Sequence, residues 1–262
     1  MRLRVQRFEP ARDASPRYQV YELEDTPGQT VLGALFEVQD RHDGSIAFRY
    51  SCRGAVCGSC AMLINKVPRL ACKTQVTDAM EGATSNLQTF GTIDHEVMDW
   101  DPETEILIEP LPNFPVIRDL VVDMTRFWDV LEEVEPWLVP AEDPPKGLER
   151  SMEPGDVLKL ERLVGCILCG LCSGSCPVVH DEQDFLGPAA LAKARRFYED
   201  PRDVRRDGIL EMLYTEEGFE GCDLIYNCVK VCPKNVAPGG AIRKMKEDAA
   251  KLPRLERRGN GI

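Results

Sequence analysis

Eleven cysteines constrain this 262-residue chain more than any other feature, because they fall in three short groups. An odd number of cysteines leaves one thiol over in a closed disulfide framework. Residues 1–19 lack the apolar stretch of a secretory signal peptide, so we expect a reducing cytosol, where disulfides are rare. Clustered cysteines in that compartment are usually metal ligands, and the grouping therefore favours metal sites.

The first group has the spacing of a plant-type [2Fe–2S] site, a Cys-x4-Cys-x2-Cys loop followed by a more distant fourth cysteine. The predicted ligands are Cys52, Cys57, Cys60 and Cys72. Gly54 and Gly58 allow the backbone to approach the cluster sulfides and to aim N–H groups at them. A zinc site is the alternative, but zinc knuckles usually pair two Cys-x2-Cys hairpins. The spacing therefore favours [2Fe–2S].

The second group follows the bacterial ferredoxin pattern Cys-x2-Cys-x2-Cys-x3-Cys-Pro. In that pattern the first three cysteines bind one cluster and the fourth binds another. The third group repeats it with Ile225 at the position of the second cysteine. A [4Fe–4S] cluster would then take four ligands, Cys166, Cys169, Cys172 and Cys232.

The remaining cluster keeps three cysteines, namely Cys176, Cys222 and Cys228. Isoleucine cannot bind iron, so Ile225 favours a [3Fe–4S] cluster with one open corner. The alternative is a [4Fe–4S] cluster whose fourth ligand is not a cysteine, such as Asp223. Four ligands, four ligands and three ligands for the three clusters account for all 11 cysteines.

The rest of the sequence excludes several functions. A formal net charge of -12 disfavours a nucleic-acid partner and a direct grip on anionic lipid. No stretch of 18 apolar residues is present, so we expect membrane association only through a partner. We find no dinucleotide-binding glycine motif, phosphate loop or Ser–His–Asp signature. Three clusters without a substrate motif predict an electron-transfer protein.

Hydrophobic patterns divide the chain into an α+β domain at residues 1–115 and a helical domain at residues 116–262. Strands are predicted by period-2 alternation and β-rich composition near residues 3–5, 18–23, 46–50, 61–64 and 104–108. Thr30 is a candidate N-cap for a short helix. Helices are predicted over residues 116–133, 188–198, 204–214 and 241–251, and the proline-rich segment 135–156 is predicted to be extended.

Segments spread over most of the chain resemble the iron–sulfur subunit of succinate dehydrogenase and quinol:fumarate reductase, which is respiratory complex II. The matching segments are Ser51–Met62, Pro110–Pro112, Val116–Leu120, Glu135–Trp137, Cys166–Cys172, Leu186–Pro188 and Cys232–Lys234. The resemblance implies a β-grasp, plant-ferredoxin-like N-terminal domain and a helical, bacterial-ferredoxin-like C-terminal domain.

The resemblance also implies the partners of the chain. Electrons would pass from FAD of a flavoprotein subunit through [2Fe–2S], [4Fe–4S] and [3Fe–4S] to quinone in a membrane anchor, as in the tricarboxylic acid cycle enzyme. The dicarboxylate chemistry would lie on the flavoprotein, so no catalytic residue is assigned here. The subunit would be peripheral, at the cytoplasmic face of a prokaryotic membrane.

Two departures from the family refine these expectations. Val178, Val179 and His180 replace a tryptophan-bearing segment near the quinone of the ubiquinone-type enzymes, and Asp223 replaces a histidine. A cytochrome b anchor with menaquinone fits these changes better. Residues 74–103 are longer than we expect for the family and are interpreted as an insertion of unassigned role.

Three alternatives to succinate oxidation remain open from the residues. One is quinol:fumarate reductase, the reverse direction with the same ligands. A second is a soluble thiol-linked fumarate or heterodisulfide reductase subunit, although such relatives usually carry further cysteine-rich domains. The third is a structural zinc protein, which metal analysis would separate from a chain holding about nine irons.

Overall fold

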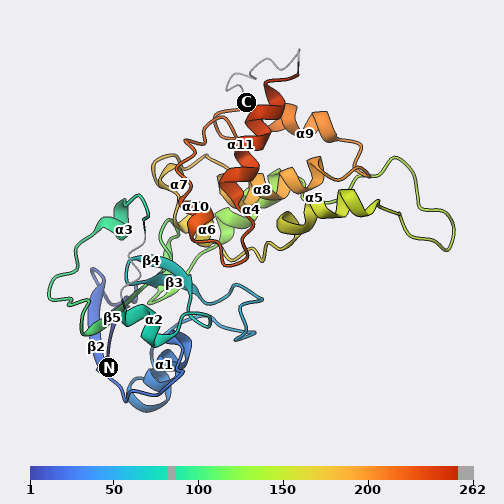
Figure 1. Ribbon diagram of the computed structural model, residues 1–262. Coiled ribbons are helices and arrows are strands. Elements are labelled where there is room, and N and C mark those ends of the chain that lie inside the picture. Colours follow the sequence, from blue (N-terminus) through green and yellow to red (C-terminus); the bar gives the residue numbers. More distant parts are fainter. Residues whose placement is uncertain (82–85, 253–262) are drawn as a thin grey trace. The chain divides into compact units, whose positions relative to one another are not determined.

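The computed structural model describes residues 1–81 and 86–252, which divide into two compact units (Figure 1). The first unit comprises Met1–Met124 together with Ile167–Pro177, and the second comprises Thr125–Cys166 and the residues from Val178 onward. The second cysteine run is therefore divided after Cys166. These units are defined by packing, and the sequence-based boundary between residues 115 and 116 stays a prediction.

A five-stranded mixed sheet forms the core of the first unit. Its spatial order is β2 (Arg17–Glu22), β1 (Arg2–Arg7), β5 (Glu105–Glu109), β3 (Ala61–Ile64) and β4 (Val67–Leu70). β1 pairs with β5 in parallel, and the other neighbours pair in antiparallel fashion. Leu3, Val5 and Ile106 are among the side chains that the sheet buries completely.

The helix predicted after Thr30 is confirmed as α1 (Val31–Glu37), which continues as the π-helical turn η1 (Val38–His42). The Thr30 hydroxyl caps it by accepting a hydrogen bond from the Gly33 N–H at 3.1 Å. The Leu32 N–H donates to the Ala71 carbonyl at 3.0 Å, which joins the helix to the chain just before Cys72. A mixed sheet with this helix confirms the α+β class.

Two predicted elements differ from the structure. Residues 46–50 form no strand. The helix predicted over residues 116–133 is confirmed only in its second half, as α4 (Thr125–Glu133), and two short strands precede it, β6 (Val116–Arg118) and β7 (Val121–Val122). Asp119 has a φ of 47°, which ends any helix there. The Asp119 and Leu120 N–H groups instead donate to the distant carbonyls of Phe8 and Ala47.

The segment interpreted as an insertion contains two short helices, α2 (Val76–Met80) and α3 (Gly91–Asp94), and its residues 82–85 lie outside the described residues. Side chains of the β3–β4 turn hold it. The Asn65 amide donates to the Ala79 carbonyl at 2.8 Å, and the Lys66 ammonium donates to the Thr92 carbonyl at 3.0 Å. These bonds tie the segment to the sheet.

The second unit is helical, as predicted. Besides α4, its helices are α5 (Pro154–Val164), α7 (Pro177–Asp181), α8 (Gly187–Tyr198), α9 (Arg206–Leu213), α10 (Asn227–Lys230) and α11 (Pro238–Ala249). Helix α7 begins at Pro177, the last residue of the first unit. Arg195 of α8 forms an ion pair with Asp248 of α11 at 2.6 Å. Pro154, predicted to be extended, instead starts α5, because proline suits the first turn of a helix.

Within the part of the chain that the structure describes, no helix combines the length and the apolar character needed to cross a membrane.

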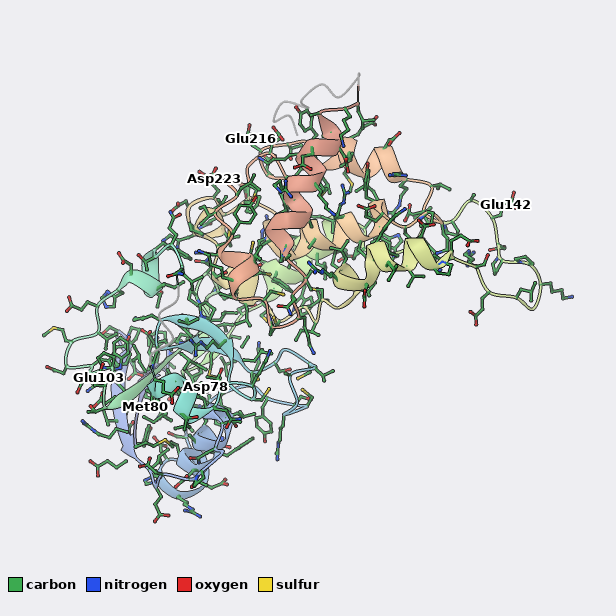
Figure 2. All side chains as sticks on the ribbon, viewed as in Figure 1. Asp78, Met80, Glu103, Glu142, Glu216 and Asp223 are labelled. Atoms are coloured by element: carbon green, nitrogen blue, oxygen red, sulfur yellow. The ribbon has the colours of Figure 1, made fainter. Side chains whose placement is uncertain are left out.

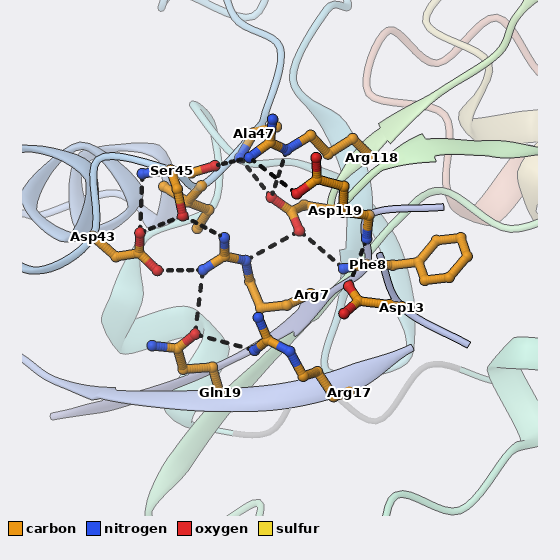
Figure 3. Close-up of polar contacts among 12 residues, drawn as sticks. Arg7, Phe8, Asp13, Arg17, Gln19, Asp43, Ser45, Ala47, Arg118 and Asp119 are labelled. Carbon is orange, nitrogen blue, oxygen red and sulfur yellow. Dashed lines mark hydrogen bonds and ion pairs between the residues drawn. The ribbon is translucent and has the colours of Figure 1, made fainter. Parts of the chain in front are cut away.

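A buried arginine links three segments of the first unit (Figure 3). The Arg7 guanidinium donates to Asp119 Oδ1 at 3.1 Å and to the Ser45 hydroxyl at 2.9 Å, and it forms an ion pair with Asp43. The hydrogen bond from Ser45, with help from Arg7, holds the pKa of Asp43 well below its usual range. Burial raises the pKa of the neighbouring Tyr21 to about 12, so the phenol stays protonated.

The Asp119 carboxylate accepts backbone hydrogen bonds as well. Its Oδ1 accepts from the Phe8 N–H and its Oδ2 accepts from the Ala47 N–H, both at 2.9 Å. Ala47 lies five residues before Cys52, so this carboxylate fixes the chain as it enters the first cysteine loop.

Replacing Asp119 by alanine should lower the free energy of unfolding by about 2–4 kcal/mol, because it removes the acceptor of the buried Arg7 Nε–H and of the Phe8 and Ala47 N–H groups. Urea denaturation followed by circular dichroism measures the change. Asp40→Ala, at an exposed position, is the control and should cost less than about 0.5 kcal/mol. Equal losses in the two variants would contradict the structural role of Asp119.

Candidate metal centres

The first cysteine loop wraps backbone N–H groups around a sulfur atom. Cys52 Sγ accepts hydrogen bonds from the N–H groups of Gly54, Val56 and Cys57, at 3.4, 3.3 and 3.2 Å. Arg53 and Ala55 have positive φ values of 55° and 56°, and these left-handed turns produce the curvature of the loop. A concave array of N–H groups of this kind binds anionic sulfur.

The same loop brings the four predicted [2Fe–2S] ligands together. Cys57 Sγ accepts a hydrogen bond from the Cys52 N–H, and Cys60 Sγ accepts one from the Cys72 N–H, both at 3.4 Å. Cys72 Sγ accepts one from the Ala55 N–H at 3.3 Å. Four sulfurs served by backbone donors have the chemistry that an iron–sulfur cluster requires of its ligands.

The environments of these thiols differ. The backbone N–H of Cys52 lowers the pKa of Cys57 to about 6, whereas burial raises the pKa of Cys60 to about 12. Cys52 itself is exposed. A coordinated metal deprotonates a thiol outright, so ligation would overcome the burial of Cys60.

Arg53 directly follows Cys52, and two aromatic rings hold its side chain. Its guanidinium carbon lies 4.8 Å from the ring centroid of Phe36 and 5.5 Å from that of Tyr50. The two rings meet edge to face, with centroids 4.6 Å apart. Cation–π contact therefore keeps a positive charge beside the cysteine loop.

The second and third cysteine runs repeat one backbone conformation. The residue two positions after the first cysteine is left-handed in both, with φ values of 52° at Leu168 and 54° at Leu224. The residue four positions after it is also left-handed, with φ values of 76° at Gly170 and 66° at Tyr226. A four-residue helix begins at the next residue in each run, α6 (Leu171–Gly174) and α10.

This repeat places Ile225 at the backbone position that Cys169 occupies in the second run. The isoleucine is half-buried, whereas Asp223, labelled in Figure 2, is exposed. The left-handed conformation of Leu168, Leu224 and Tyr226 is absent from the sequence prediction, since such residues rarely adopt it. The available signal was that Leu224 and Tyr226 have the same offsets from the first cysteine of their run as Leu168 and Gly170. The glycine at one of these four positions indicates a left-handed residue there.

The structure divides the remaining predicted ligands between the two units. Cys169, Cys172 and Cys176 belong to the first unit, and Cys166, Cys222, Cys228 and Cys232 belong to the second. The assembly of each complete ligand set therefore stays a prediction.

Within the second unit, Cys166 and Cys232 pack against the same apolar cluster, which contains Leu163 and Val236. Cys232 Sγ accepts a hydrogen bond from the Val236 N–H at 3.3 Å. Burial raises the pKa of Cys222, and Cys228 is buried beside Gly239. Cys166 and Cys232, which the sequence assigns to one cluster, thus share one packing environment.

All 11 cysteines are free of disulfides. Nowhere in residues 1–81 and 86–252 do three or more His, Cys, Asp or Glu side chains converge as ligands of one metal ion.

Of the residues that depart from the ubiquinone-type pattern, Val178 is buried and His180 is exposed.

Family comparisons agree with both predicted types of cluster site. Residues 2–129 match the family described as a 2Fe-2S iron-sulfur cluster binding domain. Residues 162–236 match the family described as a 4Fe-4S dicluster domain. These matches confirm [2Fe–2S]- and [4Fe–4S]-binding domains in the expected order.

Curated relatives match almost the whole chain. It is 37% identical to a fumarate reductase iron-sulfur subunit from Mycobacterium tuberculosis, covering 95% of this chain and 92% of that protein. It is 35% identical to a succinate dehydrogenase iron-sulfur subunit from Coxiella burnetii, covering 95% and 96%. Among solved structures, a chain of the Mycobacterium smegmatis Sdh1 complex in the apo form matches with a TM-score of 0.74 and 27% identity, covering 95% of both chains.

Replacing Arg53 by methionine should lower the reduction potential of the [2Fe–2S] cluster, because a nearby cation favours the more negative, reduced state. A redox titration followed by EPR measures the midpoint. Arg12→Met removes an exposed arginine of the same unit and should leave the midpoint unchanged. An unchanged midpoint in the Arg53 variant would contradict the role of this charge.

Proposed function

Since the chain belongs to the family of iron–sulfur subunits of succinate dehydrogenase and fumarate reductase, we propose that it conducts electrons between FAD of a flavoprotein subunit and a quinone at a membrane anchor. Operating one way the complex oxidises succinate, and operating the other way it reduces fumarate. The flavoprotein carries out the dicarboxylate chemistry. This chain contributes the redox centres of the oxidoreductase.

The 11 cysteines hold three clusters in this proposal, and the clusters supply one-electron carriers. The [2Fe–2S] ligands are Cys52, Cys57, Cys60 and Cys72. The [4Fe–4S] ligands are Cys166, Cys169, Cys172 and Cys232. The [3Fe–4S] ligands are Cys176, Cys222 and Cys228. The convergent N–H···S bonds of the first loop support the first set, and the common packing of Cys166 and Cys232 supports the second.

The single observation that supports the proposed [3Fe–4S] site is the repeated backbone conformation of the second and third cysteine runs. Leu224 and Tyr226 copy the left-handed conformations of Leu168 and Gly170, so Ile225 takes the place of a ligand without changing the fold of the run. Its side chain offers no donor atom. The exposed Asp223 lies two positions away from the equivalent site, which disfavours it as a substitute ligand.

The partner subunits place the chain at a membrane surface. The anchor is a cytochrome b that uses menaquinone, and the chain is peripheral at the cytoplasmic face of the membrane. Support for menaquinone comes from Asp223 and His180, which stand where the ubiquinone-type enzymes have other residues. The similarity to a chain of a mycobacterial Sdh1 complex supports assembly with further subunits.

The substitution Ile225→Cys tests the open corner. Wild-type complex, oxidised, should show the EPR signal of a [3Fe–4S] cluster. The variant supplies a thiolate at the missing position, so it should lose that signal and gain one iron per chain as the cluster becomes [4Fe–4S]. EPR spin quantitation and iron analysis measure the two effects.

Leu224→Cys is the matched control for this experiment. It adds a thiol one residue earlier, at the position that Leu168 fills in the second run, where no ligand is found in the proposed set. It should keep the [3Fe–4S] signal. A wild-type protein with its full iron content and no such signal would show that the ligand assignment is wrong.

A further inference from the structure

The chain around Cys169 touches the first cysteine loop at a glycine. A Cβ atom on Gly58 would lie 2.7 Å from the Cβ and 2.8 Å from the Cα of Cys169. Real Cβ atoms do not approach other atoms so closely, so only glycine fits here without a shift of the backbone. Gly58 is buried, and both residues belong to the first unit.

Further contacts hold the same segment, residues 167–177, from other sides. A Cβ atom on Gly174 would lie 2.7 Å from Leu111 Cδ1 and 3.1 Å from the Pro112 carbonyl oxygen. The Asn113 amide donates to the carbonyls of Ser173 and Cys176, at 2.9 and 3.0 Å. The segment is therefore fixed to the sheet-containing unit by close backbone packing and by hydrogen bonds.

These contacts join two proposed ligand sets. Gly58 is bonded to Cys57 of the [2Fe–2S] set, and it packs against Cys169 of the [4Fe–4S] set. One residue and one van der Waals contact therefore separate a ligand of the first cluster from a ligand of the second. Electron tunnelling weakens with distance, so the packing at Gly58 bears directly on transfer between these clusters.

We propose that Gly58 is a positioning residue that sets the distance between the [2Fe–2S] and [4Fe–4S] clusters, an inference that rests on the proposed ligand sets. A side chain at this position pushes residues 167–177 away from the loop. A side chain at Gly174 crowds the Leu111 side chain and the Pro112 carbonyl oxygen, so it shifts the same segment without altering the loop.

Gly58 also has a φ of 77°, so its replacement strains the backbone as well as the contact. Gly28 separates the two effects, because its φ is 75° and no atom lies within 4 Å of its Cβ position. Gly28→Ala therefore reproduces the strain without any contact.

The test is EPR power saturation of the reduced [2Fe–2S] signal in the complete complex. A nearby reduced [4Fe–4S] cluster accelerates the relaxation of that signal, and this effect falls with distance. Gly58→Ala and Gly174→Ala should both lower the half-saturation power, with both cluster signals retained. Gly28→Ala should leave it at the wild-type value.

An unchanged half-saturation power in either contact variant that retains both clusters would overturn the inference. So would a decrease in Gly28→Ala equal to that in Gly58→Ala, since strain alone would then explain it. If the Gly58→Ala variant loses its [2Fe–2S] cluster, the half-saturation power of the Gly174→Ala variant decides whether the inference stands. Wild-type complex without a [4Fe–4S] signal is a different result, because it refutes the proposed ligand set itself.

Discussion

Hydrogen bonding from backbone N–H groups to cysteine sulfur is the constraint around which the first cysteine loop is built. Aiming several N–H groups at one thiolate bends the chain sharply, and the bend needs left-handed residues. Arg53 and Ala55 provide it in the first loop, and in the third run the left-handed Leu224 donates a backbone hydrogen bond to the Cys222 thiol. Each such residue costs roughly 1–2 kcal/mol, which the surrounding packing must offset.

The rest of the first unit holds these bends in place. The Asp119 carboxylate fixes the chain before the loop through the Ala47 N–H. The loop itself is braced by Arg53, whose side chain lies against Phe36 of α1. On the far side of the loop, Gly58 packs against Cys169, so the loop and residues 167–177 form parts of one packed body. The sheet thus positions the proposed ligands of more than one cluster.

Cysteine spacing was sufficient to predict the [2Fe–2S]- and [4Fe–4S]-binding domains, because cluster ligation restricts both residue type and offset. Secondary structure was less predictable where side chains compete with local propensity. The apolar spacing of residues 116–133 suits a helix, but a buried Asp119 captures backbone donors from two distant segments and turns the chain at that point. The residues at 46–50 are β-formers, yet Phe48 and Tyr50 pack with Phe36 in place of a neighbouring strand.

The contact between Gly58 and Cys169 could not be predicted from the sequence either. It joins positions 111 residues apart, and a glycine in a cysteine loop has a sufficient local reason to be there. Ile225 is the opposite case, since the sequence alone predicts a missing ligand there, and the backbone of the third run repeats that of the second.

The central claim is that Ile225 leaves one corner of a cluster without a ligand. An anomalous difference map at the iron absorption edge, from crystals of the oxidised complex, tests this most directly. The account predicts three iron peaks beside Cys176, Cys222 and Cys228, with no peak next to the Ile225 side chain. A fourth iron peak at that corner would contradict it.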